Sequence, residues 1–321
     1  MSGRRRRHDC LTMDLSLHRL AESQHGIVTT AQATRLGWSP KDLRRSVRSG
    51  GLVHLARGLY AVPASGLQSA VGRHRALCRG ALMLYPDAVL SHASAVVGYD
   101  LPIFGMVLGR AFLMRPVEAE VLTQSFVVRP LSGGGRSETL LGPAVSLATA
   151  VVQHTLDNGL APGLVAADAA LHRGDMGMPE LLEAAATVRG WPRSGRITSL
   201  LSFVDGRSES VGESRLRLDL ALAGIPVVPQ VVIREANGAF VARVDLIVRG
   251  TKVVIEFDGL VKYREHGADA LIAEKRREDR LRRLGYLVVR VTWADLAQPA
   301  KVLSWVRDAL RTSRASAPPA A

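Results

Sequence analysis

Two acidic residues interrupt an apolar run near the C-terminal end of the chain. The run "VVIEFDG", residues 253–259, has the β-branched and aromatic content of a buried strand, yet it contains Glu256 and Asp258. An ionised carboxylate that is buried without a partner costs several kcal/mol, so such strands rarely carry two of them. The sequence therefore predicts that these acids have a specific partner.

Strand pairing brings a third acid to the same place. The preceding run, "FVARVDLIVR", is joined to this strand through "GTK", where Gly250 suits the first central position of a type II′ turn. This register sets Asp245 opposite Glu256, and alternation puts Asp258 on the same face. Like charges directly opposite each other destabilise a sheet. A hard cation such as Mg²⁺ would neutralise them, so we predict a Mg²⁺ site here.

The elements around these acids follow the order αβββαβ. A helix in "SESVGESRLRLDLALAGIP" precedes three β-runs, and the charged helix "GADALIAEKRREDRLRRLG" leads to a last strand, "YLVVRVTW". The core "VDLIVRGTKVVIEFDG", supported by "GYLVVRVTW", resembles the PD-(D/E)XK nucleases, in particular very-short-patch repair endonucleases, over about residues 205–297. The resemblance implies a restriction-endonuclease-like fold and an enzyme that hydrolyses phosphodiester bonds in DNA with Mg²⁺.

The resemblance also assigns roles to individual residues. Asp245 corresponds to the first acid and Glu256 to the second, and Glu213 corresponds to the helical glutamate that completes the metal shell. Asp258 stands where the family motif has a lysine, which puts activity in doubt. The base or electrophile would then be Lys262 or Lys275, because lysine can shift its pKa and arginine cannot. Four arginines of the charged helix are expected to face phosphates or solvent: Arg276, Arg277, Arg280 and Arg283.

Each of these roles has a structural alternative. Glu213 also completes an S-x-x-E capping box with Ser210, and Asp258 before Gly259 suits a plain turn. Asp245 and Glu256 could instead form a buried ion network with one of three arginines, which are Arg243, Arg215 and Arg290. For the whole domain, the alternatives are a nuclease-like fold that only binds, as in a regulator, and an enzyme that processes RNA or nicks.

Charge is distributed unevenly along the chain. Residues 1–80 carry 14 Lys and Arg against 4 Asp and Glu, residues 81–200 carry 8 against 10, and residues 201–321 carry 20 against 15. Two basic ends around a neutral middle predict two surfaces that bind polyanions. The alternative is an arginine-rich composition with solvated basic faces.

Residues 14–62 have the pattern of a winged helix. Three short helices precede a hairpin, "LVHLARGLYAV", which turns near Arg57. The third helix, "SPKDLRRSVRSGG", begins at Ser39 with an S-x-x-D box completed by Asp42. In such domains the third helix enters the major groove and the wing contacts the backbone. The candidate DNA-binding residues are therefore Lys41, Arg44, Arg45, Arg48 and, on the wing, Arg57.

The stretch "HGIVTTAQATRLGWSPKDLRRSVRSGGLVHLARGLYAVP" resembles the N-terminal winged helix of AbiEi-type antitoxins. The resemblance implies binding to double-stranded promoter DNA and leaves a cognate toxin open as a further partner. Residues 63–204 are similar to the central α/β region of AbiEi-like proteins and contain no catalytic motif. His92, flanked by apolar residues, is expected to be a core or turn histidine.

The sequence as a whole predicts a multi-domain α/β protein. Its expected parts are a basic arm (1–13), a winged helix (14–62), the central region (63–204), the nuclease-like domain (205–312) and a tail (313–321). No run of 18 apolar residues is present, and the start lacks the apolar segment of a secretory signal. Cys10 and Cys78 have no metal-ligand spacing, which favours free thiols in the cytoplasm.

Overall fold

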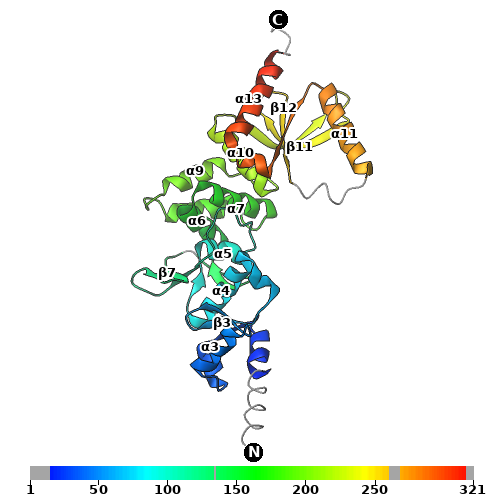
Figure 1. Ribbon diagram of the computed structural model, residues 1–321. Helices are drawn as coiled ribbons and strands as arrows, with labels where there is room; N and C mark the ends of the chain where they lie inside the picture. Colours follow the sequence, from blue (N-terminus) through cyan, green and yellow to red (C-terminus); the bar gives the residue numbers. More distant parts are fainter. Residues whose placement is uncertain (1–14, 134, 260–267, 316–321) are drawn as a thin grey trace, which may run out of the picture. The chain divides into compact units, whose positions relative to one another are not determined.

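The computed structural model describes residues 15–133, 135–259 and 268–315, and it has the predicted mixed α/β architecture (Figure 1). The chain forms two compact units. The first is Met1–Gly159 with Pro179–Ser194, and the second is Leu160–Met178 with Gly195–Ala321. Two helices expected in the central region, α7 (Leu160–Arg173) and α9 (Gly195–Phe203), thus belong to the unit that carries the C-terminal sheet.

A winged helix opens the first unit. Residues 15–22 are helical. The next elements are β1 (Ile27–Thr29), α2 (Thr30–Arg35), α3 (Pro40–Arg48), β2 (Val53–Ala56) and β3 (Leu59–Ala61). The strands form one sheet in the order β1-β3-β2. The three predicted helices and the hairpin are confirmed, whereas the sequence patterns missed β1, because three residues are too few to show alternation.

Local signals in the sequence fix the ends of α3. Ser39 Oγ accepts the Asp42 amide, and the Asp42 carboxylate accepts the Ser39 amide, so the predicted capping box is present. Leu43 lies on the buried side of α3, in a core with Leu17 and Leu52. The hairpin turns at Gly58, whose φ of +80° is left-handed and favours glycine. The basic side of α3 is thereby directed away from this core.

A six-stranded sheet in the order β6-β7-β5-β4-β9-β8 forms the rest of the first unit. A 3-10 turn, η1 (Ser65–Gln68), leads into it. Its strands are β4 (Val89–Leu90), β5 (Ala111–Arg115), β6 (Val121–Leu122), β7 (Phe126–Pro130), β8 (Arg136–Thr139) and β9 (Gly142–Val145). Its helices are α4 (Ala70–Leu84), α5 (His92–Gly98), α6 (Leu147–Asn158) and α8 (Met178–Thr187). The predicted strands β5 and β7 and helices α4 and α6 are confirmed, but "GPAV" is a strand rather than the start of α6.

His92 is buried at the start of α5, as predicted. Its Nδ1 lies 2.9 Å from Ser91 Oγ, its amide donates to Gln153 Oε1, and its Nε2 contacts the Arg129 guanidinium. Burial lowers the pKa of His92 well below its usual range, and the charge of Arg129 lowers it further. The ring is therefore neutral and serves the packing of this unit.

The second unit contains the predicted αβββαβ order. Its elements after α9 are α10 (Val211–Leu222), β10 (Val227–Arg234), β11 (Phe240–Val248), β12 (Val253–Asp258), α11 (Ala268–Arg283), β13 (Leu287–Thr292), α12 (Trp293–Leu296) and α13 (Pro299–Ala315). The sheet order is β10-β11-β12-β13, antiparallel except for the parallel pair β12 and β13. The tail expected from residue 313 is wrong at its start, because α13 continues to Ala315.

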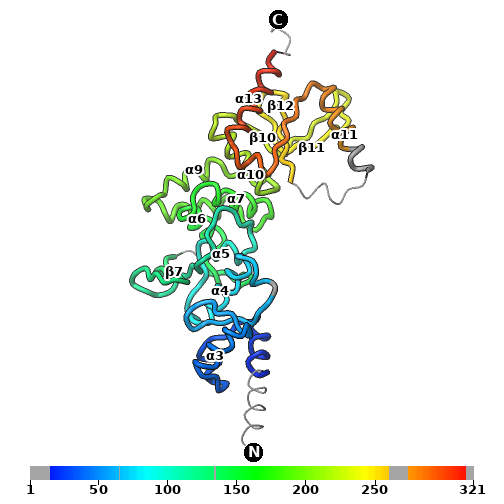
Figure 2. Tube along the Cα trace, in the orientation of Figure 1, coloured from blue at the N-terminus to red at the C-terminus, as the bar shows by residue number. Residues whose placement is uncertain are grey.

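Helices cover both faces of this sheet. Helices α10 and α13 lie on one face and α11 lies on the other (Figures 1 and 2). A Cβ on Gly212 of α10 would lie 2.1 Å from the Phe257 ring of β12, so only glycine permits this close approach. A buried ion pair of 2.6 Å between Arg217 on α10 and Asp168 on α7 joins the helices of this unit.

Candidate functional site

Strands β11 and β12 pair in the predicted register. The Cα partners are Leu246 with Ile255 and Ile247 with Val254, as that register requires; the predicted pair of Asp245 with Glu256 lies one step beyond these pairs. The turn differs in detail: Thr251 N donates to Val248 O, which places Gly250 second, not first, among the central residues. The register survives because the loop has an even number of residues.

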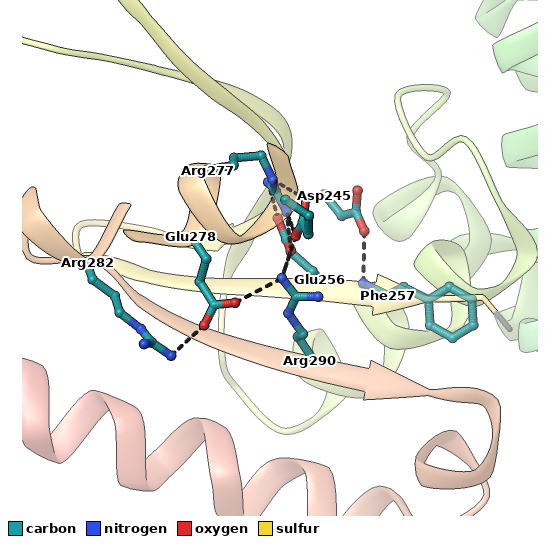
Figure 3. Close-up of polar contacts among 8 residues, drawn as sticks. Asp245, Glu256, Phe257, Arg277, Glu278, Arg282 and Arg290 are labelled. Carbon is teal, nitrogen blue, oxygen red and sulfur yellow. Dashed lines mark hydrogen bonds and ion pairs between the residues drawn. The ribbon is translucent and has the colours of Figure 1, made fainter. Parts of the chain in front are cut away.

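Asp245 ends the regular pairing of the two strands. Its Oδ2 accepts a hydrogen bond of 2.8 Å from the backbone amide of Phe257, one residue beyond Glu256 (Figure 3). On the other side of β11, the ladder runs from Pro229 with Leu246 to Val231 with Val244. The residue between them on β10 is Gln230, which the ladder skips.

Gln230 has a left-handed backbone with a φ of +54°, which is costly for a residue other than glycine. This conformation directs its amide to α10, where Nε2 donates to Glu213 Oε2 at 2.9 Å. Glu213 also accepts from Ser210 Oγ at 2.8 Å and from the Glu209 amide at 3.0 Å. Ser210 Oγ in turn accepts the Glu213 amide. Ser210 therefore caps α10 as the structural alternative proposed, but the Glu213 carboxylate accepts the amide of Glu209 and not that of Ser210, so the capping box is present only in part.

Glu256 forms a bidentate ion pair with an arginine of α11. Its two oxygens accept from Arg277 Nη1 and Nη2, each at 2.8 Å, and its side chain is 12% exposed. Arg277 also binds Glu274, one turn earlier on α11, at 2.7 and 2.8 Å. The expectation that Arg277 faces phosphates or solvent is wrong. Its guanidinium turns to the sheet, where its planar fork of donors matches the Glu256 carboxylate of β12, while Glu274 of α11 accepts from the same group.

The ion pairs continue across α11 and β13 (Figure 3). Arg290 lies 2.5 Å from Glu274, 3.3 Å from Glu278 and 4.0 Å from Glu256. The hydrogen bonds from Arg277, followed by those from Arg290, lower the pKa of Glu274 to about 2. The same contacts raise the pKa of Arg277. Two arginines and three glutamates thus meet here, and Arg282, which lies 2.5 Å from Glu278, brings a third cation to the cluster.

Of the three arginines proposed for an ion network, only Arg290 lies near Glu256. Arg243 instead pairs with Glu209 at 2.8 and 2.9 Å, and Arg215 donates to the carbonyl of Leu296. Sequence reasoning missed Arg277 and Gln230. Arg277 could have been found, since it lies four residues before the buried Leu281 and shares its side of α11. The left-handed Gln230 leaves no signal in the sequence.

As they are arranged, the acids do not form a set of metal ligands. Glu256 and Glu213 use both carboxylate oxygens in internal contacts, and Asp245 uses one on Phe257. Within the described ranges, no group of three His, Cys, Asp or Glu side chains could hold a metal ion. Asp258 ends β12, half-buried, beside Thr292 of β13. The Mg²⁺ site therefore stays a prediction that would require these side chains to move.

Among the described residues, no contact joins the lysine candidate Lys275 to these acids. Lys275 is exposed on α11, whereas Lys262 lies outside the described residues, as do Cys10 and the basic arm. Cys78 is buried in α4, where burial raises the pKa of its thiol to about 12. This thiol is therefore inert, and neither cysteine is assigned a role in the site.

The second candidate surface lies on the winged helix. All the predicted contacts are exposed there: Lys41, Arg44, Arg45 and Arg48 on α3, and Arg57 at the turn of the β2–β3 wing. Between helix and wing is an open groove of about 390 Å³ lined by Arg44, Val47, Arg48, His54 and Tyr60. The rings of His54 and Tyr60 are 5.3 Å apart. The groove adds these two side chains, which sequence reasoning missed, to the predicted set.

Residues 16–63 match the family model described as "Transcriptional regulator, AbiEi antitoxin". The match spans the winged helix and ends before α4. The chain is also 26% identical, over 273 residues, to proteins from two strains of Mycobacterium tuberculosis, both named only as uncharacterized. The aligned region covers 84% of this chain and 96% of each relative, so the similarity extends through both units. None of the helices among the described residues is long and apolar enough to span a membrane.

Proposed function

We propose that the protein is a transcriptional regulator of the AbiEi antitoxin type that binds duplex DNA through its winged helix. The observation that carries this proposal is the cluster of exposed cations on α3 beside the wing groove. The family match over the same residues supports it. A cognate toxin is the protein partner that such a family implies, and operator DNA is the nucleic-acid partner.

The dimensions of α3 suit the major groove. An α-helix with its side chains is about 10–12 Å across, and the major groove is about 12 Å wide, so α3 can lie along it. Arg44 and Arg48 lie on the side of α3 that lines the groove to the wing, with His54 opposite. Arginines can contact base edges or phosphates, whereas wing side chains mainly fix the position of the protein on the backbone.

DNA binding by this surface can be measured through its salt dependence. Each phosphate contact releases about 0.9 counterion, so Arg44→Ala/Arg45→Ala should lower the slope of log K against log salt by about one to two. The duplex would be the region upstream of the protein's own gene. The matched control, Arg136→Ala/Arg189→Ala, removes the same charge from exposed positions of the first unit. An unchanged slope in the first variant would remove α3 from the interface.

Hydrolysis of DNA with Mg²⁺ is the second candidate function. The predicted register of Asp245 and Glu256 and the αβββαβ order favour it. The bidentate pair of Glu256 with Arg277 favours a domain that no longer cuts. Plasmid nicking with and without Mg²⁺ tests it, with Glu256→Gln as the control for a contaminating nuclease. If the parent nicks the plasmid and Glu256→Gln does not, the protein is the enzyme. Lys262→Ala and Lys275→Ala would then identify which lysine takes part in the reaction.

A further inference from the structure

The arginines of α11 lie on two sides of the helix, one facing the sheet and one facing away from it. On the inner side, Arg277 is neutralised by Glu256 and Glu274. On the outer side, Arg276 and Arg283 are exposed and form no ion pair with any described residue. The ion pairs that fix α11 to the sheet thus leave Arg276 and Arg283 without an ion-pair partner among the described residues.

These outer cations line a groove. Its volume is about 610 Å³, and its lining residues are Arg276, Asp279, Arg280, Arg282 and Arg283. Two of the arginines have nearby acids: Arg280 lies 3.3 Å from Glu235, and Arg282 lies 2.5 Å from Glu278. Asp279 is the one acid in the lining. Two of the four guanidinium groups, those of Arg276 and Arg283, have no ion-pair partner among the described residues, so the groove favours an anion with several charges.

The spacing of the cations fits a nucleic-acid backbone. Arg276, Arg280 and Arg283 are separated by four and three residues, so they share one side of α11 over about 10 Å. Phosphates on one DNA strand rise about 3.4 Å each along the helix axis, so this length covers about three of them. Among the described residues, no aromatic side chain lines the groove, and proteins that hold unpaired bases stack them on such side chains. The geometry therefore favours duplex over single-stranded DNA.

We propose that the outer side of α11 is a second binding site for the phosphate backbone of duplex DNA. It lies in the second unit and is separate from the winged helix, so it goes beyond the function proposed above. With its arginines on phosphates rather than on base edges, it would add affinity for any sequence. The protein would then hold DNA at two places, one of which selects the sequence.

The experiment uses the full chain in an Arg44→Ala/Arg45→Ala background, so that the winged helix contributes less to the measurement. The probe is a duplex of unrelated sequence, titrated over a range of salt. Arg276→Ala/Arg283→Ala should lower the salt slope by about one to two, at about 0.9 per phosphate lost. The matched control, Arg307→Ala/Arg314→Ala, removes the same charge from exposed positions of α13 and should change the slope by less than half as much. Asp279→Asn should tighten binding.

Three results would overturn the proposal. If the α11 and α13 variants lowered the salt slope of DNA binding equally, net charge alone would attract the DNA. No loss in the α11 variant, or looser binding by Asp279→Asn, would remove this surface from the interface. Loss of binding to phosphatidylserine vesicles without loss of DNA binding would assign it to a membrane surface. The winged helix is tested separately with the parent protein and its upstream DNA, so either proposal can fail alone.

Discussion

Neutralising Glu256 separates the two interpretations of the acidic strand. In Glu256→Gln the side chain keeps its shape but loses the charge that pairs with both nitrogens of Arg277. Removing one partner of a fully buried pair costs about 3–5 kcal/mol. Arg277 is 26% exposed and retains Glu274, so water and the second acid offset part of this loss. We expect the C-terminal sheet to be destabilised by about 2 kcal/mol.

Hydrogen exchange in peptides from β12 and β13 is the suitable assay, because it reports the opening of this sheet rather than of the whole chain. Asp245→Asn is the matched control. Asparagine still offers an oxygen to the Phe257 amide, so its cost should stay below about 1 kcal/mol. A cycle with Arg277→Met should show a coupling of about 1–3 kcal/mol between positions 256 and 277.

The opposite result would refute this reasoning. If the acids repel each other while awaiting a cation, both neutral variants should match or exceed the parent in stability without metal. Mg²⁺ should then stabilise the parent by RT ln(1 + [L]/Kd) and leave the variants unchanged. That pattern would show that Arg277 is not the natural partner of Glu256 and would restore the nuclease interpretation.

Two further predictions concern packing and pH. Gly212→Ala should cost about 1–3 kcal/mol by forcing its Cβ into the Phe257 ring, and urea denaturation monitored by hydrogen exchange in α10 checks this. If the loss is absent, α10 can move away from β12 freely. Burial lowers the pKa of His154 to about 4, below its unfolded value of about 6.5. The unfolded chain thus binds more protons between these values, and the first unit should lose up to about 3 kcal/mol as pH falls from 6.5 to 4. This loss of stability at low pH should be smaller in His154→Gln. If the variant and the parent had the same pH profile, His154 would not be the group responsible.

The parts of the fold that the sequence could predict are those set by local chemistry. The capping box of Ser39 and Asp42 marks the start of α3 within a few residues. The register of β11 and β12 follows from alternation and an even loop, so Asp245 could be set opposite Glu256 without coordinates. These predictions depend on neighbours in the chain or on one hairpin.

The parts that could not be predicted depend on contacts between distant segments. The partner of Glu256 is 21 residues away on α11, where composition alone does not choose among the arginines and only their spacing from the buried Leu281 favours Arg277. Asp168 lies within the predicted central region, yet its buried pair with Arg217 joins α7 to α10 of the second unit. The second unit accordingly includes Leu160–Met178, which the predicted boundary at residue 204 leaves out.

The nature of the cation beside Glu256 bears on what this domain can do. A metal ion exchanges with water and can be lost or regained, whereas Arg277 is part of the chain and keeps its charge at every accessible pH. Its pKa is raised further by Glu274 and Glu256, so it cannot act as the base that the missing motif lysine would supply. For Mg²⁺ to bind Glu256, the guanidinium must first leave two carboxylates, and this cost is subtracted from the affinity for the metal. The arrangement therefore favours a sheet whose acids fix α11 in place, with the DNA-facing chemistry on the other side of that helix.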